Sequence, residues 1–326
     1  MGVLARLATT LLAKGWLAEE PYHAGISGLF ATRAATELFA EADCVIGIGA
    51  SLSPYTTEHG YLYPNARFVH LDNRPHVIMG DGRGADCYVQ GDARVSVESL
   101  ERLLAERGVQ STGYHTPQTT QALAQPIDPR QFDVQPGLVD PREAVTCLDE
   151  CLPPETGVVI GGGHFISFPY MHMRKPRPTF LSTIHFGCIG QGVGTAIGAV
   201  VARGNQPTVL VDGDASTLMH VVEIETAARY RLPLLAVVLN DEALGAEYHK
   251  LRAHGLEQDL ARITTPDLGA VARAFGGRGA QARSVAELQG AVKEFLAEPG
   301  PMIVDVRVSR EVVSVPYRRV HFGAEE

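Results

Sequence analysis

Two apolar runs in the second half of the chain each stop at carboxylates. Residues 209–216 read VLVDGDAS, and residues 232–241 read LPLLAVVLND. If both runs are strands of a parallel sheet, their carboxyl ends share one edge, and Asp214 and Asp241 approach each other there.

Two neighbouring carboxylates repel unless a cation lies between them. Magnesium prefers such oxygen ligands together with phosphates, and Ser216 with the backbone N–H groups of a following helix would suit a phosphate. The sequence therefore predicts a Mg²⁺–diphosphate site.

The elements that would position this site alternate between strands and helices along the chain. This alternation predicts an α/β protein with two doubly wound parallel-sheet domains, whose ligands lie at the carboxyl ends of the strands. Strands are expected within 43–53, 67–73, 85–94, 157–165, 209–216, 232–241 and 301–308, and helices within 97–107, 141–152, 218–231, 266–276 and 284–298.

The two blocks are joined by a segment of different composition. Residues 108–136 are rich in Gln, Thr, Pro and Gly and show no sustained period, which is typical of a linker that crosses the surface. We therefore expect one domain at 1–107 and a second at 137–326.

Composition limits the functional classes. The chain has 326 residues, 45% of them hydrophobic, and a formal net charge of −9. A general nucleic-acid-binding protein is more often basic, so no nucleic-acid partner is expected. No apolar run approaches the length needed to cross a bilayer and no signal-peptide pattern is present, so no membrane association is expected. Five scattered cysteines, an odd number, favour free thiols and a cytoplasmic location.

The polar strand ends resemble the signature of thiamine diphosphate-dependent enzymes. That signature reads Gly-Asp-Gly, a spacer, then Asn-Asn; here Gly213-Asp214-Ala215 is followed by a spacer of 24 residues and by Asn240-Asp241. The stretches FGCIGQGVGTAIGA, HLDNRP and VQGDA also resemble the family's, in the family's order. The resemblance is nearest to acetolactate synthase large-subunit-like proteins. It implies a partial, Rossmann-like central domain in the first block and a thiamine diphosphate-binding domain in the second.

The resemblance implies roles for individual positions. Asp214, Asp241 and the backbone carbonyl of Ala243 would bind Mg²⁺, and Glu247 and His249 are the candidate catalytic residues. Asp241 stands where the family normally has Asn, which adds a negative charge beside the diphosphate. Contacts with the cofactor are implied at Gly163, His164, Gly187, Ile189, Gly213, Ala215, Ser216 and Ala246.

Thiamine diphosphate and Mg²⁺ are thus the expected cofactors, and FAD is not expected. The implied function is that of a lyase or transferase subunit, which decarboxylates a 2-oxo acid or uses it, or another small carbonyl compound, to form a C–C bond. In this family a pyrimidine-binding domain with a catalytic glutamate precedes the central domain, and nothing in these 326 residues resembles it. We therefore expect a second chain that carries this domain, in a hetero-oligomer with two copies of each chain.

Three other interpretations stay open. The chain could be a non-catalytic cofactor-binding or regulatory remnant of the family. It could be a dinucleotide-binding oxidoreductase, because residues 47–51 read GIGAS, although the full Gly-x-Gly-x-x-Gly pattern is lacking. It could also be a truncated form of a longer protein.

Overall fold

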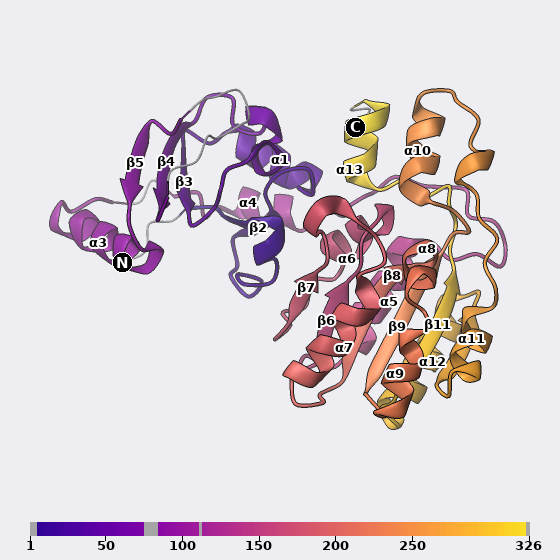
Figure 1. Ribbon diagram of the computed structural model, residues 1–326. Helices are drawn as coiled ribbons and strands as arrows, with labels where there is room; N and C mark the ends of the chain where they lie inside the picture. Colours follow the sequence, from indigo (N-terminus) through magenta and orange to yellow (C-terminus); the bar gives the residue numbers. More distant parts are fainter. Residues whose placement is uncertain (1–4, 75–83, 111–112, 324–326) are drawn as a thin grey trace. The chain divides into compact units, whose positions relative to one another are not determined.

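The protein consists of two compact units, shown in Figure 1. A computed structural model describes residues 5–74, 84–110 and 113–323. Unit 1 comprises Met1–Pro129 and unit 2 comprises Arg130–Glu326. Both units are α/β structures built on parallel strands, which confirms the predicted fold class. No helix in the described ranges combines the length and apolar character needed to cross a membrane.

Unit 1 contains two small parallel sheets. One pairs β1 with β2, and the other has the order β3-β4-β5. Phe68 and Leu62 lie in its apolar core, packed with Ala35 of the first helix. Its strands are β1 (Leu7–Thr9), β2 (His23–Ile26), β3 (Cys44–Ile48), β4 (Arg67–Asp72) and β5 (Cys87–Gln90); its helices are η1 (Leu11–Ala13), α1 (Arg33–Ala40), α2 (Pro54–Thr57), η2 (Glu58–Gly60), α3 (Ala93–Glu106) and α4 (Pro117–Leu123).

Part of the segment expected to be a linker is folded. Helix α4 lies within residues 108–136 and packs against α1, and Leu123 contacts the core of unit 1. Thr116 caps this helix by accepting a hydrogen bond from the N–H of Thr119 at 3.2 Å, and Pro117 occupies its first turn. Ser/Thr caps and an N-terminal proline start a short helix that a periodicity search does not detect.

Unit 2 is built on one six-stranded, all-parallel sheet of order β10-β11-β9-β8-β6-β7. Strands β8, β9 and β11 are buried along their whole length, as expected for strands covered on both faces. The strands are β6 (Gly157–Ile160), β7 (Phe180–Ser182), β8 (Thr208–Gly213), β9 (Leu234–Asn240), β10 (Arg278–Ala282) and β11 (Met302–Arg307).

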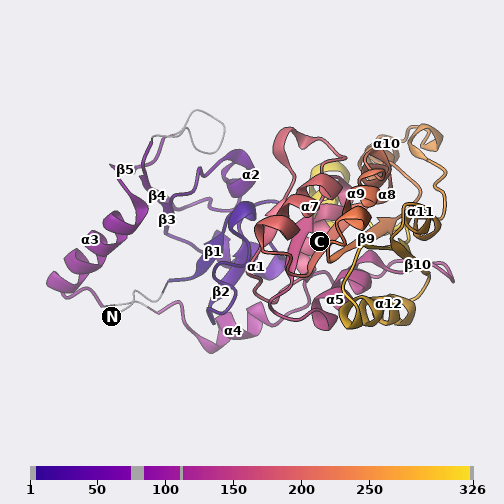
Figure 2. The same ribbon diagram turned by 60° about the horizontal axis from the view of Figure 1, so that its bottom comes forward.

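Helices cover both faces of this sheet. Figure 2 shows α7 and α9 on one side of the strands and α5 and α12 on the other. On the first face, Val193 and Ile224 pack with Leu210 of β8 in a fully buried cluster. The helices are α5 (Pro141–Cys151), η3 (His164–Ile166), α6 (Ser167–His172), η4 (His185–Gly187), α7 (Gly192–Ala202), α8 (Asp214–Met219), α9 (Glu223–Arg229), α10 (Gly245–Ala253), η5 (Asp259–Ala261), α11 (Leu268–Ala274), α12 (Val285–Ala297), α13 (Val315–Tyr317) and the π-helical turn η6 (Arg318–Phe322).

The prediction of a single helix within residues 218–231 was wrong, because the end of α8 and all of α9 lie in this stretch. Strand β8 leads directly into α8, which ends at Met219, and the backbone of the next residue, His220, is no longer helical. A tertiary contact accompanies the break: a Cβ on Gly190 would lie 3.1 Å from side-chain atoms of both Met219 and His220. The loop that carries Gly190 therefore packs closely against the end of α8.

Candidate active site

A cavity of about 300 Å³ lies at the carboxyl ends of β6, β8 and β9. Its walls come from the turn after β6, the start of α8, the segment from β9 into α10, and the loop before α7. Glu247 also reaches it from α10. The predicted cofactor and metal positions all line it: Gly163, His164, Gly187, Ile189, Gly213, Asp214, Ala215, Ser216, Asp241, Ala243 and Ala246.

Asp214 and Asp241 both line this cavity, Asp214 as a buried residue and Asp241 as a partly buried one. Asp214 is 2% exposed, and its Oδ2 has no hydrogen-bond partner among the described residues. Burial raises the pKa of Asp214 to about 6. Burial, and then the neighbouring charge of Asp214, raise the pKa of Asp241 to about 8. Backbone N–H groups and nearby arginines compensate the negative charge of each carboxyl group only in part, and a bound cation would supply the rest.

A third carboxylate, Asp212, was not singled out from the sequence. It is fully buried at the end of β8, and burial raises its pKa to about 7. Gly161 and Gly192 lie against its oxygens so closely that a Cβ at either position would overlap them. The sequence carried a signal for Asp212, because this charged residue stands within an otherwise apolar run and is therefore expected to be buried with that strand.

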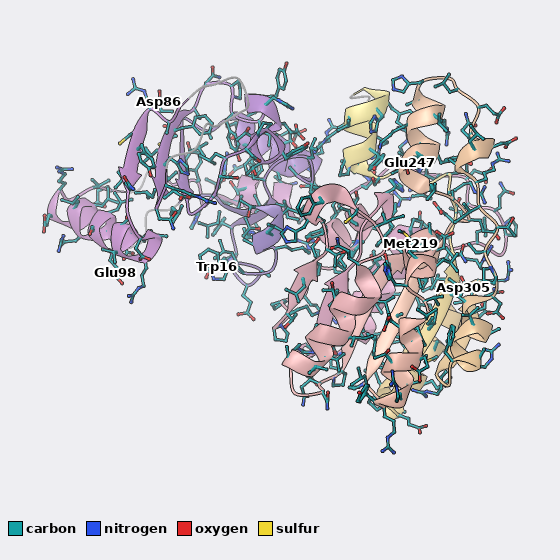
Figure 3. All side chains as sticks on the ribbon, in the orientation of Figure 1. Trp16, Asp86, Glu98, Met219, Glu247 and Asp305 are labelled. Carbon is teal, nitrogen blue, oxygen red and sulfur yellow. The ribbon has the colours of Figure 1, made fainter. Side chains whose placement is uncertain are left out.

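A buried polar network holds the turn that carries Asp241. The Nδ2 of Asn240 donates to Thr265 at 2.9 Å and to Asp305 at 2.8 Å, while its Oδ1 accepts from the N–H of Glu242 at 3.1 Å. Glu242 has a left-handed backbone (φ 54°) and forms an ion pair with Arg307 at 2.6 Å. Figure 3 shows Asp305 on the sheet, below the level of α10. Asn240 therefore supports the turn from inside the protein.

The cavity wall offers backbone groups to an anion. Helices α8 and α10 begin at the cavity, and in the described structure neither has a side-chain hydrogen bond at its N-cap. Elsewhere in unit 2, α5, α11 and α12 are capped by the side chains of Asp140, Asp267 and Ser284, whereas α9 also begins without a side-chain cap among the described residues. Uncapped N-termini carry partial positive charge and donate readily to phosphate oxygens.

Small residues let the backbone reach this wall. Gly163 (φ 133°) and Gly187 (φ 64°) have backbone conformations that side chains rarely adopt. Ala215 lies in the first turn of α8, so the alanine is accommodated where the family signature has glycine. The Oγ of Ser216 accepts the N–H of Gly190 at 2.9 Å and so ties the neighbouring loop to α8.

The two candidate catalytic residues lie in different surroundings. Glu247 lines the cavity and is half exposed, with an ion pair to Lys250 at 3.6 Å; Figure 3 shows it on α10. His249 is fully buried and is not among the residues that line the cavity. Its ring packs on His164 at 4.4 Å between centroids, and burial lowers its pKa to about 4. The structure thus brings Glu247, but not His249, to the cavity surface.

Two further polar residues of the cavity were missed. Lys250 lies one helical turn after Glu247, a spacing that could have identified it. Tyr317 stands edge-on to His164 at 4.6 Å, and burial raises the pKa of its hydroxyl to about 12. Tyr317 follows the last strand and belongs to no motif, so no pattern in the sequence could have placed it here.

Comparison with known families identifies both units. Residues 160–306 match the thiamine pyrophosphate enzyme C-terminal TPP-binding domain, and residues 4–103 match the central domain of the same enzymes. The chain belongs to the thiamine pyrophosphate enzyme family. Its cavity lies in the TPP-binding domain, and the resemblance deduced from the strand-end motifs is confirmed.

Several curated relatives match over most of this chain. It is 27% identical to the acetolactate synthase isozyme 2 large subunit of Escherichia coli, over 89% of the chain and 52% of that protein. It is 28% identical to the acetolactate synthase large subunit of Parasynechococcus marenigrum, over 93% and 50%. It is 26% identical to the sulfoacetaldehyde acetyltransferase of Castellaniella defragrans, over 93% and 55%. The chain thus spans about half the length of these relatives.

The raised pKa of Asp241 predicts an unusual pH dependence of the metal-free protein. The carboxyl of Asp241 has a pKa of about 8 when folded and about 4 when unfolded, so the folded state binds more protons between these values. The free energy of unfolding should therefore fall as the pH rises from about 4 to about 8. We expect Asp241→Asn to reduce this fall and to make the protein more stable than wild type at pH 8.

Urea denaturation with a chelator present, at several pH values, measures this effect. Glu225→Gln is the matched control, because Glu225 is half exposed on α9 and pairs with Arg229 one turn away. If wild type and Asp241→Asn lose stability equally with rising pH, the assignment of an incompletely compensated charge to Asp241 is wrong.

Proposed function

We propose that this chain supplies the metal- and diphosphate-binding half of the active site of a thiamine diphosphate-dependent enzyme. The observation that carries the proposal is the meeting of Asp214 and Asp241 in one cavity, with a buried oxygen of Asp214 lacking a partner among the described residues. The reaction would be decarboxylation of a 2-oxo acid, formation of a C–C bond from it, or both, as in an acetolactate synthase-like enzyme. The five cysteines, all free thiols, favour a cytoplasmic location.

The donor set fits Mg²⁺. Asp214, Asp241 and the carbonyl of Ala243 would provide three oxygen ligands, and diphosphate oxygens and water would complete an octahedron. The described residues contain no group of three or more His, Cys, Asp or Glu side chains placed to hold a metal. A site with two carboxylates therefore depends on the diphosphate for its remaining ligands, which couples metal binding to cofactor binding.

The remaining wall suits the rest of the cofactor. The turn with Gly163 and the amide of Ala215 would bind the diphosphate, and the side chains of Ile189 and Phe165 form an apolar part of the wall. Thiamine diphosphate, when bound, supplies the electron sink that stabilises a carbanion next to a carbonyl carbon. The protein itself binds and orients the cofactor and limits the access of water.

Proton transfer at the substrate is assigned to Glu247. Its carboxyl lines the cavity and is held by the cation of Lys250, one turn further along α10. A carboxyl group on the open side of the cofactor site can give a proton to, or take one from, a substrate oxygen. His249 would act at most through His164, because its ring lies behind that residue.

We also propose that a second chain completes the site with a pyrimidine-binding domain and its catalytic glutamate, in a hetero-oligomer with two copies of each chain. Relatives about twice as long as this chain support the need for a further domain. One exposed side chain beside the cavity is in keeping with it. Phe186, next to Gly187 in the cavity loop, is fully exposed, and a partner surface over the cavity would bury this apolar ring.

Removal of the first metal ligand tests the cofactor site. Asp214→Ala should abolish the Mg²⁺-dependent binding of thiamine diphosphate in isothermal titration calorimetry, because one of two carboxylate ligands is lost. Asp259→Ala is the control, since Asp259 is 70% exposed and pairs with Arg262. Wild-type affinity in Asp214→Ala would contradict the assignment.

The catalytic role of Glu247 is tested in the assembled enzyme. We expect Glu247→Gln to lower kcat for a 2-oxo acid about 100-fold while cofactor affinity is retained, because general acid–base catalysis contributes at least this much. Glu257→Gln, in the exposed turn after α10, is the control. Full turnover by Glu247→Gln would assign Glu247 a structural role only.

The partner is tested by comparing the chain alone with the chain co-expressed with the product of a neighbouring gene. With Mg²⁺ and thiamine diphosphate, the chain alone should release no CO₂ from pyruvate above background, and the co-purified complex should do so. Turnover by the chain alone at an ordinary enzymatic rate would contradict the divided site. Cofactor binding without turnover in any assembly would favour the non-catalytic role instead.

A further inference from the structure

The C-terminal segment of unit 2 reaches back to the cofactor cavity. After β11 the chain passes through residues 308–314 into α13 and η6, which lie beside α10 in Figure 1. Tyr317 of α13 lines the cavity, and η6 contacts α10. The C-terminal segment and the turn after β6 therefore line the same cavity.

One hydrogen bond joins these two distant parts of the chain. The backbone N–H of Ser314 donates to Nε2 of His164 at 3.2 Å, across 150 residues of sequence. A backbone N–H can only donate, so Nε2 must be the unprotonated nitrogen of the ring. The neutral imidazole then carries its proton on Nδ1, since the hydrogen bond of one ring nitrogen sets the state of the other.

The surroundings keep this ring neutral and immobile. His164 is 6% exposed, and its ring is packed between Phe168 at 5.4 Å, His249 at 4.4 Å and Tyr317 at 4.6 Å. Burial, and then the nearby His249, lower the pKa of His164 well below its usual value. A protonated ring would also lose the acceptor that the N–H of Ser314 needs.

The protonated nitrogen faces the metal corner of the cavity. A Cβ on Gly245 would lie 2.9 Å from Oδ2 of Asp241 and 3.6 Å from Nδ1 of His164, so both atoms border the same small space at the start of α10. An N–H at this point is a donor without formal charge. It can bind an anionic oxygen without competing with Mg²⁺ for the carboxylates.

We propose that the backbone N–H of Ser314 fixes His164 as its Nδ1–H tautomer, so that the ring presents a neutral donor to an anionic oxygen of the ligand in the cavity. Ser314 is then a positioning residue that acts through His164. Only the naming of that oxygen as part of a diphosphate rests on the proposed function. The tautomer itself follows from this chain's own contacts.

Two substitutions at one position separate the N–H from the side chain. Ser314→Pro removes the N–H, and the backbone at Ser314 (φ −67°, ψ 154°) already has the φ that proline requires. It also keeps the carbonyl that accepts from Arg318. Ser314→Ala is the matched control, because it keeps the N–H and loses only a hydroxyl that has no partner among the described residues.

The tautomer is read from two-bond ¹H–¹⁵N correlations of the histidine rings in the metal- and cofactor-free protein. His164→Asn identifies the His164 signals among those of the 12 histidines. Wild type and Ser314→Ala should show His164 as Nδ1–H. Ser314→Pro should show a mixture with the Nε2–H form, and its affinity for Mg²⁺-pyrophosphate and for Mg²⁺-thiamine diphosphate should fall about tenfold, as expected when one hydrogen bond to a charged oxygen is lost.

The outcomes separate this inference from the proposed function. An Nε2–H or doubly protonated His164 in wild type would overturn the inference, and this spectrum decides even if Ser314→Pro does not fold. A folded Ser314→Pro protein that keeps the Nδ1–H form and wild-type affinity would overturn it as well. An Nδ1–H ring in a wild-type protein that binds neither pyrophosphate nor thiamine diphosphate would support the tautomer and contradict the proposed function.

Discussion

Negative charge buried at one edge of a parallel sheet is the constraint on which unit 2 depends. Strands β8 and β9 are neighbours, with Gly213 opposite Leu239, so the carboxylates that follow them enter the same cavity. Arg307 lowers the pKa of Asp214 and Arg310 lowers that of Asp241, but both values stay raised because burial dominates. The metal-free protein therefore retains protons at this edge, and a divalent cation is the simplest group that relieves the repulsion.

The surrounding structure keeps this edge of the sheet in place. Asn240, which adjoins Asp241, donates from its amide to Asp305 of β11 and to Thr265, and its carbonyl oxygen accepts from the N–H of Glu242. A fully satisfied buried network of this kind specifies a single geometry. Such rigidity suits Mg²⁺, which demands a near-ideal octahedron and gains little from a flexible loop.

The last elements of the chain also contribute to this cavity. His164 lies on the turn after β6, yet its hydrogen-bonding state is set by Ser314, and its ring is packed by His249 and Tyr317. Burial keeps this imidazole neutral, so the ring provides a directed N–H donor rather than a positive charge. The positive potential that this chain provides at the cavity then comes from the helix starts and from Lys250.

The sequence by itself determined the alternating α/β order, the strands that lead to Asp214 and Asp241, and the family. Each of these depends on residues that are close together in the sequence, as a strand and the residue that follows it are. It did not reveal α4, whose capping signal lies in a polar stretch, or the break between α8 and α9, which the loop at Gly190 contacts. Only the tertiary structure decided that His249 is enclosed while Glu247 reaches the cavity, two positions apart on one helix. It also decided that Tyr317 lines the cavity. Burial and approach between distant segments depend on strand order and helix packing, and no spacing within the sequence records them.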